Sequence, residues 1–296
     1  MTELALTAAA SVWAQQSLLH DGLSVVTWVG SDGVRWPLSG GLAPIPPASG
    51  VLLQTIKGLG APFTHIDQQG AHQDGVDYLD TAFDKAMIDM KISVQASDPK
   101  GYRRTFRQWL AGWDPHKQGK LSWYTQECGE WWIKLRAAQD VSDSLSAGAV
   151  SAAEFNWSAR ADFPFWSSFD STSKTFIASA STDQGFLSLW NRGTEDGWPR
   201  YILQGPGIFT FGDNGGPRVL KMTLLAGQKV LMTSLPNRRT VRELNTNTNL
   251  YPNLVGRFST PVHAGKEVHV PVTITGATPG VSSIAAALTP LRRWPE

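Results

Sequence analysis

The sequence predicts a mainly β chain of two domains: an N-terminal β-sandwich domain with one α-helix over residues 1–164, and a C-terminal antiparallel β-sandwich of jelly-roll type over residues 165–296. Three observations predict this class. The 296 residues exceed the usual size of a single domain. The 28 glycines and 18 prolines separate many short segments of alternating polarity, which is typical of strands and turns. Only one segment has a strong helical pattern.

Regular structure begins with a predicted β-hairpin. Residues 23–30 (LSVVTWVG) and 34–38 (VRWPL) alternate as strands and flank the short glycine-containing turn SDG. The proline-rich segment 39–50 lacks backbone donors at several positions, so we expect a surface connection there. Residues 51–58 and 86–96 are two further predicted strands.

Residues 58–81 lack a clean period and are rich in Gly, Gln and Asp, so the sequence predicts a long loop. A loop of this length in a compact domain is usually functional or becomes ordered by a partner. His65 and His72 lie in it with several carboxylates, among them Asp67. Their spacing matches no metal-ligand motif, so we expect a solvated loop and no metal site.

One amphipathic helix is predicted after residue 98. Asp98 can accept hydrogen bonds from the first turn, and Pro99 fits the first helical position. The pair Asp114-Pro115 is expected to end the helix. An apolar stripe at spacings of three and four residues should dock the helix on the sheets. Its members are Tyr102, Phe106, Trp109, Leu110 and Trp113.

Residues 120–127, 130–140 and 148–161 are three further predicted strands. Trp131 and Trp132 are neighbours on the second, so their side chains point to opposite faces. Each tryptophan of this half could fill the core of its own chain, contact another subunit or stack on a sugar. The candidate subunit-interface residues are Trp28, Trp36, His65, Asp67, His72, Trp131 and Trp132.

After the segment DFPFW (162–166) every predicted element is a short strand, which places the domain boundary near residue 165. Nine such runs, separated by turn signals, suit an antiparallel sandwich of two sheets. They are TFIASA, FLSLWN, RYILQ, IFTFGD, RVLKMTLLA, QKVLMTS, TVREL, HVPVTIT and SSIAAALTP.

The stretch NRGTEDGWPRYILQGPG (191–207) is heavily punctuated by turn residues. Gly193 is expected to supply a positive φ, and Pro199 fixes φ at about −65° before a short strand from Tyr201 to Gln204. Such a stretch can hold a ligand or form a corner of the sandwich, and we favour the corner. The residues assigned to this structural turn are Asn191, Gly193, Trp198, Pro199, Gly205 and Pro206.

Charge and cysteine content argue against several classes of protein. The 26 basic and 25 acidic residues give a net charge of +1 without a long basic run, which disfavours nucleic acid held by charge and a membrane surface. Cys128 is the only cysteine, so there is no intrachain disulfide and no cysteine-based zinc site. The N-terminal segment lacks the positive flank of a signal peptide, and we expect a soluble, unprocessed protein.

No catalytic signature stands out. The chain has neither a Gly-x-Ser-x-Gly motif nor a glycine-rich phosphate loop. Glu195 and Asp196 are adjacent in a turn, and adjacency does not place two carboxylates on opposite sides of a scissile bond. We therefore predict that the protein is not an enzyme and needs no cofactor or metal.

The order of elements and the later turns resemble a known family. The segments LWNRGTEDGWPRYILQGPG, GQKVLMTSLPNRRTV, NLYPNL and RFSTPVHAGKEVHVPVTITGAT are similar to the C-terminal half of siphophage distal tail (Dit-like) proteins, also called minor tail proteins in phages of actinobacteria. The first half matches the family's ring-forming belt domain in its order of elements more than in its residues. The resemblance implies a belt domain over 1–164 and a galectin-like sandwich over 165–296.

The resemblance implies a structural virion protein at the tip of a long non-contractile phage tail. Assembled in the host cytoplasm, it would form a hexameric ring of identical copies that joins the tail tube to the baseplate hub and leaves a channel for DNA. A closed ring also removes free sheet edges. Its partners would be the tail tube, tape-measure and baseplate hub proteins, with no membrane and no sequence-specific nucleic acid.

Two other functions compete with this structural role. One is a carbohydrate-binding module that contacts host cell-wall glycans through Trp190, Arg192 and Trp198. The other is an enzyme that acts on cell-wall polymer.

Overall fold

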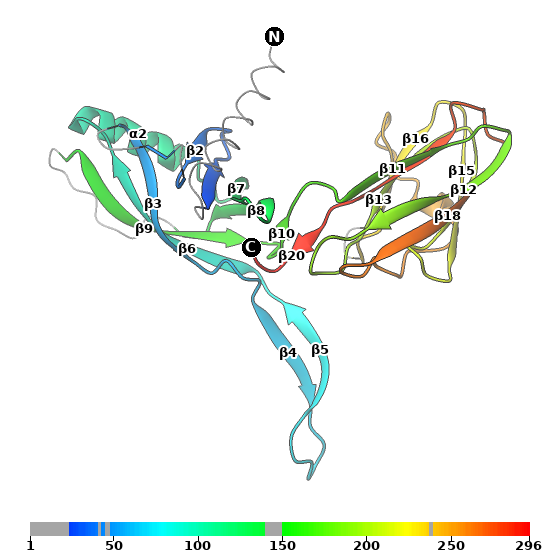
Figure 1. Cartoon of the computed structure of the whole chain (residues 1–296), viewed down its shortest axis with the longest axis horizontal. Coiled ribbons are helices and arrows are strands. Elements are labelled where there is room, and N and C mark those ends of the chain that lie inside the picture. Colours follow the sequence, from blue (N-terminus) through cyan, green and yellow to red (C-terminus); the bar gives the residue numbers. More distant parts are fainter. Residues whose placement is uncertain (1–23, 41–42, 45–47, 140–149, 237–238) are drawn as a thin grey trace. The chain divides into compact units, whose positions relative to one another are not determined.

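The computed structural model describes residues 24–40, 43–44, 48–139, 150–236 and 239–296, so the expectations for the N-terminal segment lie outside it. The chain divides into two compact units: Met1–Trp166 with Arg293–Glu296, and Ser167–Arg292. Figure 1 shows a sheet, a helix and a long two-stranded hairpin in unit 1, and two stacked sheets in unit 2. The prediction of a mainly β, antiparallel fold is confirmed.

Unit 1 is built on one antiparallel sheet whose main path runs β2-β1-β7-β8-β9-β6-β3. Its strands are β1 (Val25–Val29), β2 (Arg35–Pro37), β3 (Gly50–Lys57), β6 (Ala86–Gln95), β7 (Gly119–Thr125), β8 (Gly129–Ala137) and β9 (Ala152–Ala161), and β10 (Trp166–Ser167) also pairs with β8. The amide of Leu53 on β3 donates to the carbonyl of Leu38, just beyond β2, at 2.9 Å. The two ends of the sheet therefore approach each other.

Helix α2 (Pro99–Ala111) begins where the sequence predicts. The Asp98 carboxylate accepts a hydrogen bond from the Gly101 amide at 2.7 Å, and this bond is the main reason why the pKa of Asp98 lies below its usual value. The helix ends at Ala111 with Gly112 as its C-cap, just before the predicted stop at Asp114. No helix in the described part of the chain is long and apolar enough to cross a membrane.

Tryptophans from the helix and the sheet form the core of unit 1. Trp109 is fully buried and meets Trp36 and Trp157 edge to face, with ring centroids 5.7 and 5.9 Å apart. Trp113 stacks on Trp28 with centroids 3.9 Å apart. The apolar stripe thus packs on strands β1 and β2 and on strand β9. This is the docking on the sheet that its spacing predicts.

The prediction of a loop over residues 58–81 is wrong. This region forms a two-stranded antiparallel hairpin of β4 (Phe63–Gln68) and β5 (Asp77–Phe83), which extends as a long ribbon in Figure 1. Because every side chain of β4 is exposed, the strand has no buried face, and its polar and apolar residues alternate only weakly. Gly75 and His72, with φ values of 85° and 69°, lie in the connection between the strands.

Unit 2 is a sandwich of two antiparallel sheets, with strand orders β11-β19-β13-β16-β17 and β12-β18-β14-β15. All nine strands predicted for this half are present. They are β11 (Thr172–Ile177), β12 (Thr182–Trp190), β13 (Arg200–Gln204), β14 (Gly207–Gly212), β15 (Val219–Leu224), β16 (Lys229–Thr233), β17 (Thr240–Glu243), β18 (Glu267–Thr275) and β19 (Ser283–Leu288), followed by the short β20 (Leu291–Arg292).

A polar network crosses the core of unit 2. The buried Tyr201 hydroxyl donates to Oδ1 of Asn214 at 2.5 Å, and the Asn214 amide donates to the carbonyl of Thr260 at 2.7 Å. Burial, with a smaller contribution from the Asp213 carboxylate, raises the pKa of Tyr201 well above its usual value. The phenol therefore stays neutral and acts as a donor that ties β13 to the segment after residue 258.

The last four residues of the chain belong to unit 1. The Ala61 amide donates to the carbonyl of Arg293 at 3.1 Å, and the Trp123 indole donates to the Glu296 carboxylate at 2.9 Å. The Trp294 ring lies so close to Gly60 that a Cβ at this glycine would stand 2.6 Å from it. Unit 1 is thus completed by residues that follow the whole of unit 2 in the sequence.

Candidate functional site

The predicted structural turn is organised by Asn191, which is fully buried. Its Nδ2 donates to the carbonyls of Glu195 and Val262, each at 2.9 Å. Its Oδ1 accepts from the Gly193 amide, also at 2.9 Å. One side chain therefore satisfies three backbone groups and joins the end of β12 to the segment before β18.

The physical role predicted for Gly193 is wrong. Its φ is not positive; instead the residue packs against the backbone of Leu291, and a Cβ would lie 2.7 Å from the Leu291 nitrogen and closer still to its oxygen. Gly205 is similarly confined by Leu224 and Leu225, and it precedes a cis peptide bond to Pro206. Close approach of backbones, which the local sequence does not reveal, requires glycine at these positions.

The other two turn residues flank the entrance of β13. Trp198 is half-buried and Pro199 is buried. The Pro199 carbonyl accepts from the Ser234 hydroxyl at 2.7 Å, which fixes the entrance of the strand against the end of β16.

We expect Asn191→Ala to destabilise unit 2 by about 2–3 kcal/mol, because it breaks three hydrogen bonds and leaves buried backbone groups without partners. Urea denaturation followed by tryptophan fluorescence would measure the loss. Asn245→Ala, at an exposed asparagine of the same unit, is the matched control. Equal stability of the two variants would contradict this role for Asn191.

The seven candidate interface residues differ in burial and fall into three groups. Trp28, Trp36 and Trp131 are buried in the core of their own chain, and the Trp131 indole donates to the carbonyl of Cys128 at 2.9 Å. Trp132 is half-exposed, with the Lys120 ammonium 4.6 Å from its ring centre. The other three residues, His65, Asp67 and His72, are exposed on the β4–β5 hairpin.

The β4–β5 hairpin carries apolar side chains that its own unit does not cover. Tyr78 is 61%, Leu79 56% and Phe63 52% exposed. Nδ1 of His65 lies 3.1 Å from the Thr81 hydroxyl, which also lies 2.7 Å from the Tyr78 hydroxyl. A two-stranded hairpin of this kind is at best marginally stable alone in water, and exposed apolar groups of this kind are typical of interaction sites.

The base of the hairpin is anchored by aromatic contacts within unit 1. Phe63 and Phe83 are cross-strand partners with ring centroids 6.3 Å apart. The Phe83 ring also meets Phe165 at 4.8 Å, and Phe165 meets Phe163 at 5.2 Å. The base is therefore held by aromatic packing, while the side chains of the strands beyond it are largely exposed.

The three candidate glycan residues are placed differently from one another. Trp190 ends β12 and is 48% exposed. Arg192 donates to the Ser168 hydroxyl at 2.7 Å and to the Phe169 carbonyl at 3.3 Å. Its guanidinium thus binds the segment before β11 of the same chain. Trp198 is half-buried. Within the described residues, no group of three or more His, Cys, Asp and Glu side chains could hold a metal ion.

The sequence did not predict two features, the pairing of β4 with β5 and a pocket on unit 2. The alternation of FTHIDQ and DYLDTAF is a weak strand signal that the glycines and glutamines between them obscured. Arg239, Arg242 and Tyr251 line a pocket on unit 2, and nothing in their spacing predicts that the chain brings them together.

A curled sheet with a helix and a hairpin in unit 1, followed by a two-sheet sandwich in unit 2, is the fold of phage distal tail proteins. No protein family and no curated protein matches the sequence. The chain is similar to the SPP1 Dit protein, described as a paradigm of the hub adsorption apparatus in phages that infect Gram-positive bacteria. The TM-score is 0.58 at 10% identity, over 90% of this chain and 98% of that one.

The baseplate of phage P2 contains chains of the same fold. In its activated conformation with Ca, the matching chain gives a TM-score of 0.53 at 14% identity, over 90% of this chain and 97% of that one. The corresponding structure with Sr gives a TM-score of 0.52 at the same identity and the same coverage. The resemblance to distal tail proteins stated from the sequence is thus confirmed for the fold, across both units.

Proposed function

We propose that the protein is a structural component of a phage tail tip. Copies of it form a ring, with six subunits as the expected number, that joins the tail tube to the baseplate hub and leaves a channel for DNA. Support comes from the shared fold, which extends over nearly the whole of the SPP1 Dit chain rather than over one domain. In this role the protein is a scaffold of the virion and catalyses no reaction.

The observation that carries this proposal is the uncovered β4–β5 hairpin. Its apolar side chains are about half exposed or more, while its base is locked by Phe83 and Phe165. An identical surface on every copy is suited to a head-to-tail contact, which closes into a ring when the rotation between copies is a fraction of a full turn. The net charge of +1 allows many copies to associate without strong repulsion.

Imaging of the purified full chain tests the proposal. Negative-stain electron microscopy and mass photometry should show closed rings, alone or after addition of the tail tube and hub proteins. A protein that stays monomeric with all of these partners, and that is absent from assembled tails, would overturn it.

The second candidate function, glycan binding, is favoured by one exposed face of unit 2. Phe186, which is 64% exposed, and Trp190 lie on the same face of β12. The register of β12 with β18 sets Ser188 opposite His269 and Trp190 opposite Glu267. Aromatic faces next to polar side chains are the chemistry that binds sugars by stacking and hydrogen bonding.

If this face binds cell-wall glycans, Trp190→Ala should weaken binding on a glycan array by at least about tenfold, because stacking on the indole is lost. The half-buried Trp198 gives a matched variant outside this face. Binding by the wild type that Trp190→Ala leaves unchanged would exclude this face as the glycan site.

A further inference from the structure

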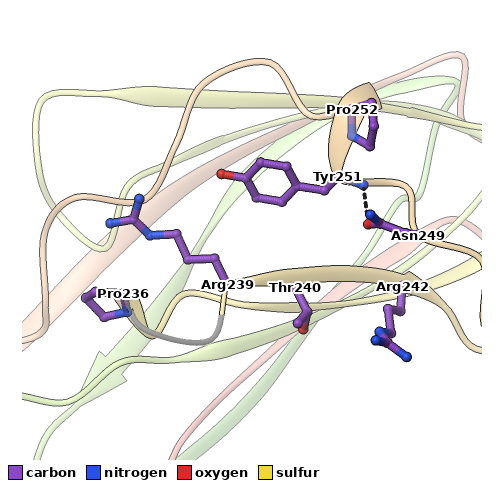
Figure 2. Close-up of a pocket in the computed structure, with 7 residues that line it drawn as sticks. All are labelled: Pro236, Arg239, Thr240, Arg242, Asn249, Tyr251 and Pro252. Carbon is purple, nitrogen blue, oxygen red and sulfur yellow. Dashed lines mark hydrogen bonds between the residues drawn. The ribbon is translucent and has the colours of Figure 1, made fainter.

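A pocket of about 510 Å³ lies on unit 2 between the edge strand β17 and the short 3-10 helix η2 (Tyr251–Asn253), as Figure 2 shows. Its volume is within the range of about 300–1,000 Å³ that is typical of small-ligand sites. The lining residues are Pro236, Arg239, Thr240, Arg242, Asn249, Tyr251 and Pro252. The lining thus contains two arginines and no acidic residue.

The backbone brings these residues together by turning back on β17. Strand β17 pairs with β16 on one side only. On its other side the Glu243 amide donates to the Thr248 carbonyl at 3.0 Å, and the Leu250 amide donates to the Val241 carbonyl at 2.8 Å. The Asn249 side chain then accepts from the Tyr251 amide at 3.0 Å, which fixes the start of η2 beside the strand.

The positive charge of the pocket is not neutralised by the described part of the chain. Neither Arg239 nor Arg242 has an ion-pair partner among those residues, and Arg242 donates only to the neutral amide oxygen of Asn247, at 3.0 Å. Nε of Arg239 is buried and has no acceptor among them. Buried donors are almost always hydrogen-bonded, and a guanidinium matches carboxylate and phosphate oxygens best.

A flat aromatic surface lies next to this charge. Figure 2 shows the Tyr251 ring extending over the pocket toward the side where the Arg239 guanidinium lies, with Arg242 at the other end. Tyr251 is 39% exposed, and Pro236 and Pro252 add further apolar walls. The ring offers a stacking face, and its hydroxyl can donate or accept a hydrogen bond.

From these contacts we propose that the pocket binds an anionic saccharide, that is, a sugar that carries a phosphate or a carboxylate. The anionic group binds Arg239, and the sugar ring stacks on Tyr251. A concave site of this volume suits a small ring compound better than a flat protein surface. None of its lining residues belongs to the hairpin or to β12, and the proposal does not depend on ring formation.

Titration calorimetry with the full chain tests the proposal, with glucose 1-phosphate, glucuronic acid, glucose and inorganic phosphate as probes. At least one of the two charged sugars should bind, glucose should not, and inorganic phosphate should bind more weakly because it cannot stack. Arg239→Gln should weaken binding by at least about tenfold. Arg257→Gln, which removes the same charge at an exposed position of unit 2, should leave binding unchanged.

Several results would overturn the proposal. One is that neither charged sugar binds. Another is that Arg239→Gln and Arg257→Gln lose the same affinity for the sugar. A third is that Tyr251→Ala binds the sugar as tightly as the wild type. Inorganic phosphate that binds as tightly as glucose 1-phosphate would identify a simple anion site. A polyglutamate peptide that binds more tightly than both sugars would identify an acidic protein partner instead. Thermal melts of each variant would confirm that it is folded.

Discussion

Replacing residues 64–82 by an Asn-Gly turn should abolish formation of the proposed ring and leave a folded monomer. The excised strands are exposed along nearly their whole length, so unit 1 loses little buried surface. Phe63 and Phe83, which stay, are direct cross-strand partners and can be joined by a two-residue turn. The ring fraction in mass photometry, compared with that of the intact chain, measures the effect.

Point variants test whether the exposed side chains of the hairpin, and not only its backbone, make the proposed contact. Tyr78→Ser with Leu79→Ser removes the two most exposed apolar side chains within β5 and should strongly reduce the ring population. Val219→Ser, at a position on unit 2 that is 57% exposed, is the matched control. Normal rings from the deletion variant would show that the hairpin does not form the subunit contact, and the ring proposal would then need another surface.

Trp109→Ala should destabilise unit 1 by about 3–5 kcal/mol, the second large effect that we expect. The ring is fully buried and meets Trp36, Trp113 and Trp157, so its removal leaves a cavity lined by α2, β2, β9 and the segment that follows the helix. Differential scanning calorimetry should show the lower transition temperature, and near-UV circular dichroism should lose intensity because the tryptophan cluster is broken.

The conservative variant Trp109→Phe should be less damaging. It keeps an aromatic ring and removes an indole N–H that has no hydrogen-bond partner among the described residues. Trp190→Ala, at a half-exposed position of unit 2, should hardly change stability. A loss below about 1 kcal/mol for Trp109→Ala would mean that the cluster contributes little to the fold.

The sequence predicts those elements that bury one face. Helix α2 is recognisable because Asp98 and Pro99 mark its start and its stripe repeats at three and four residues. The nine strands of unit 2 are recognisable because inward positions such as Tyr201 and Leu203 alternate with outward ones. The β4–β5 hairpin was missed for the opposite reason, since neither of its faces is buried by the chain that contains it.

The parts of the sites that depend on distant segments could not be predicted. Gly193 is required because the backbone of Leu291 passes next to it. The residues around Gly193 in the sequence do not indicate this contact. Arg239 and Tyr251 share a pocket only because the chain pairs Arg242 with Asn249 after β17. Burial of Trp28, Trp36 and Trp131 likewise depends on how the sheet ends meet, so sequence alone left their core and interface roles open.

The return of Arg293–Glu296 to unit 1 affects the order in which the two units can complete their folding. During vectorial synthesis unit 2 emerges before these residues do, and domains generally fold as soon as they are complete. The Ala61 amide and the Trp123 indole can form their hydrogen bonds to Arg293 and Glu296 only after unit 2 has been synthesised. A chain whose synthesis stops within the sandwich therefore lacks the segment that completes unit 1.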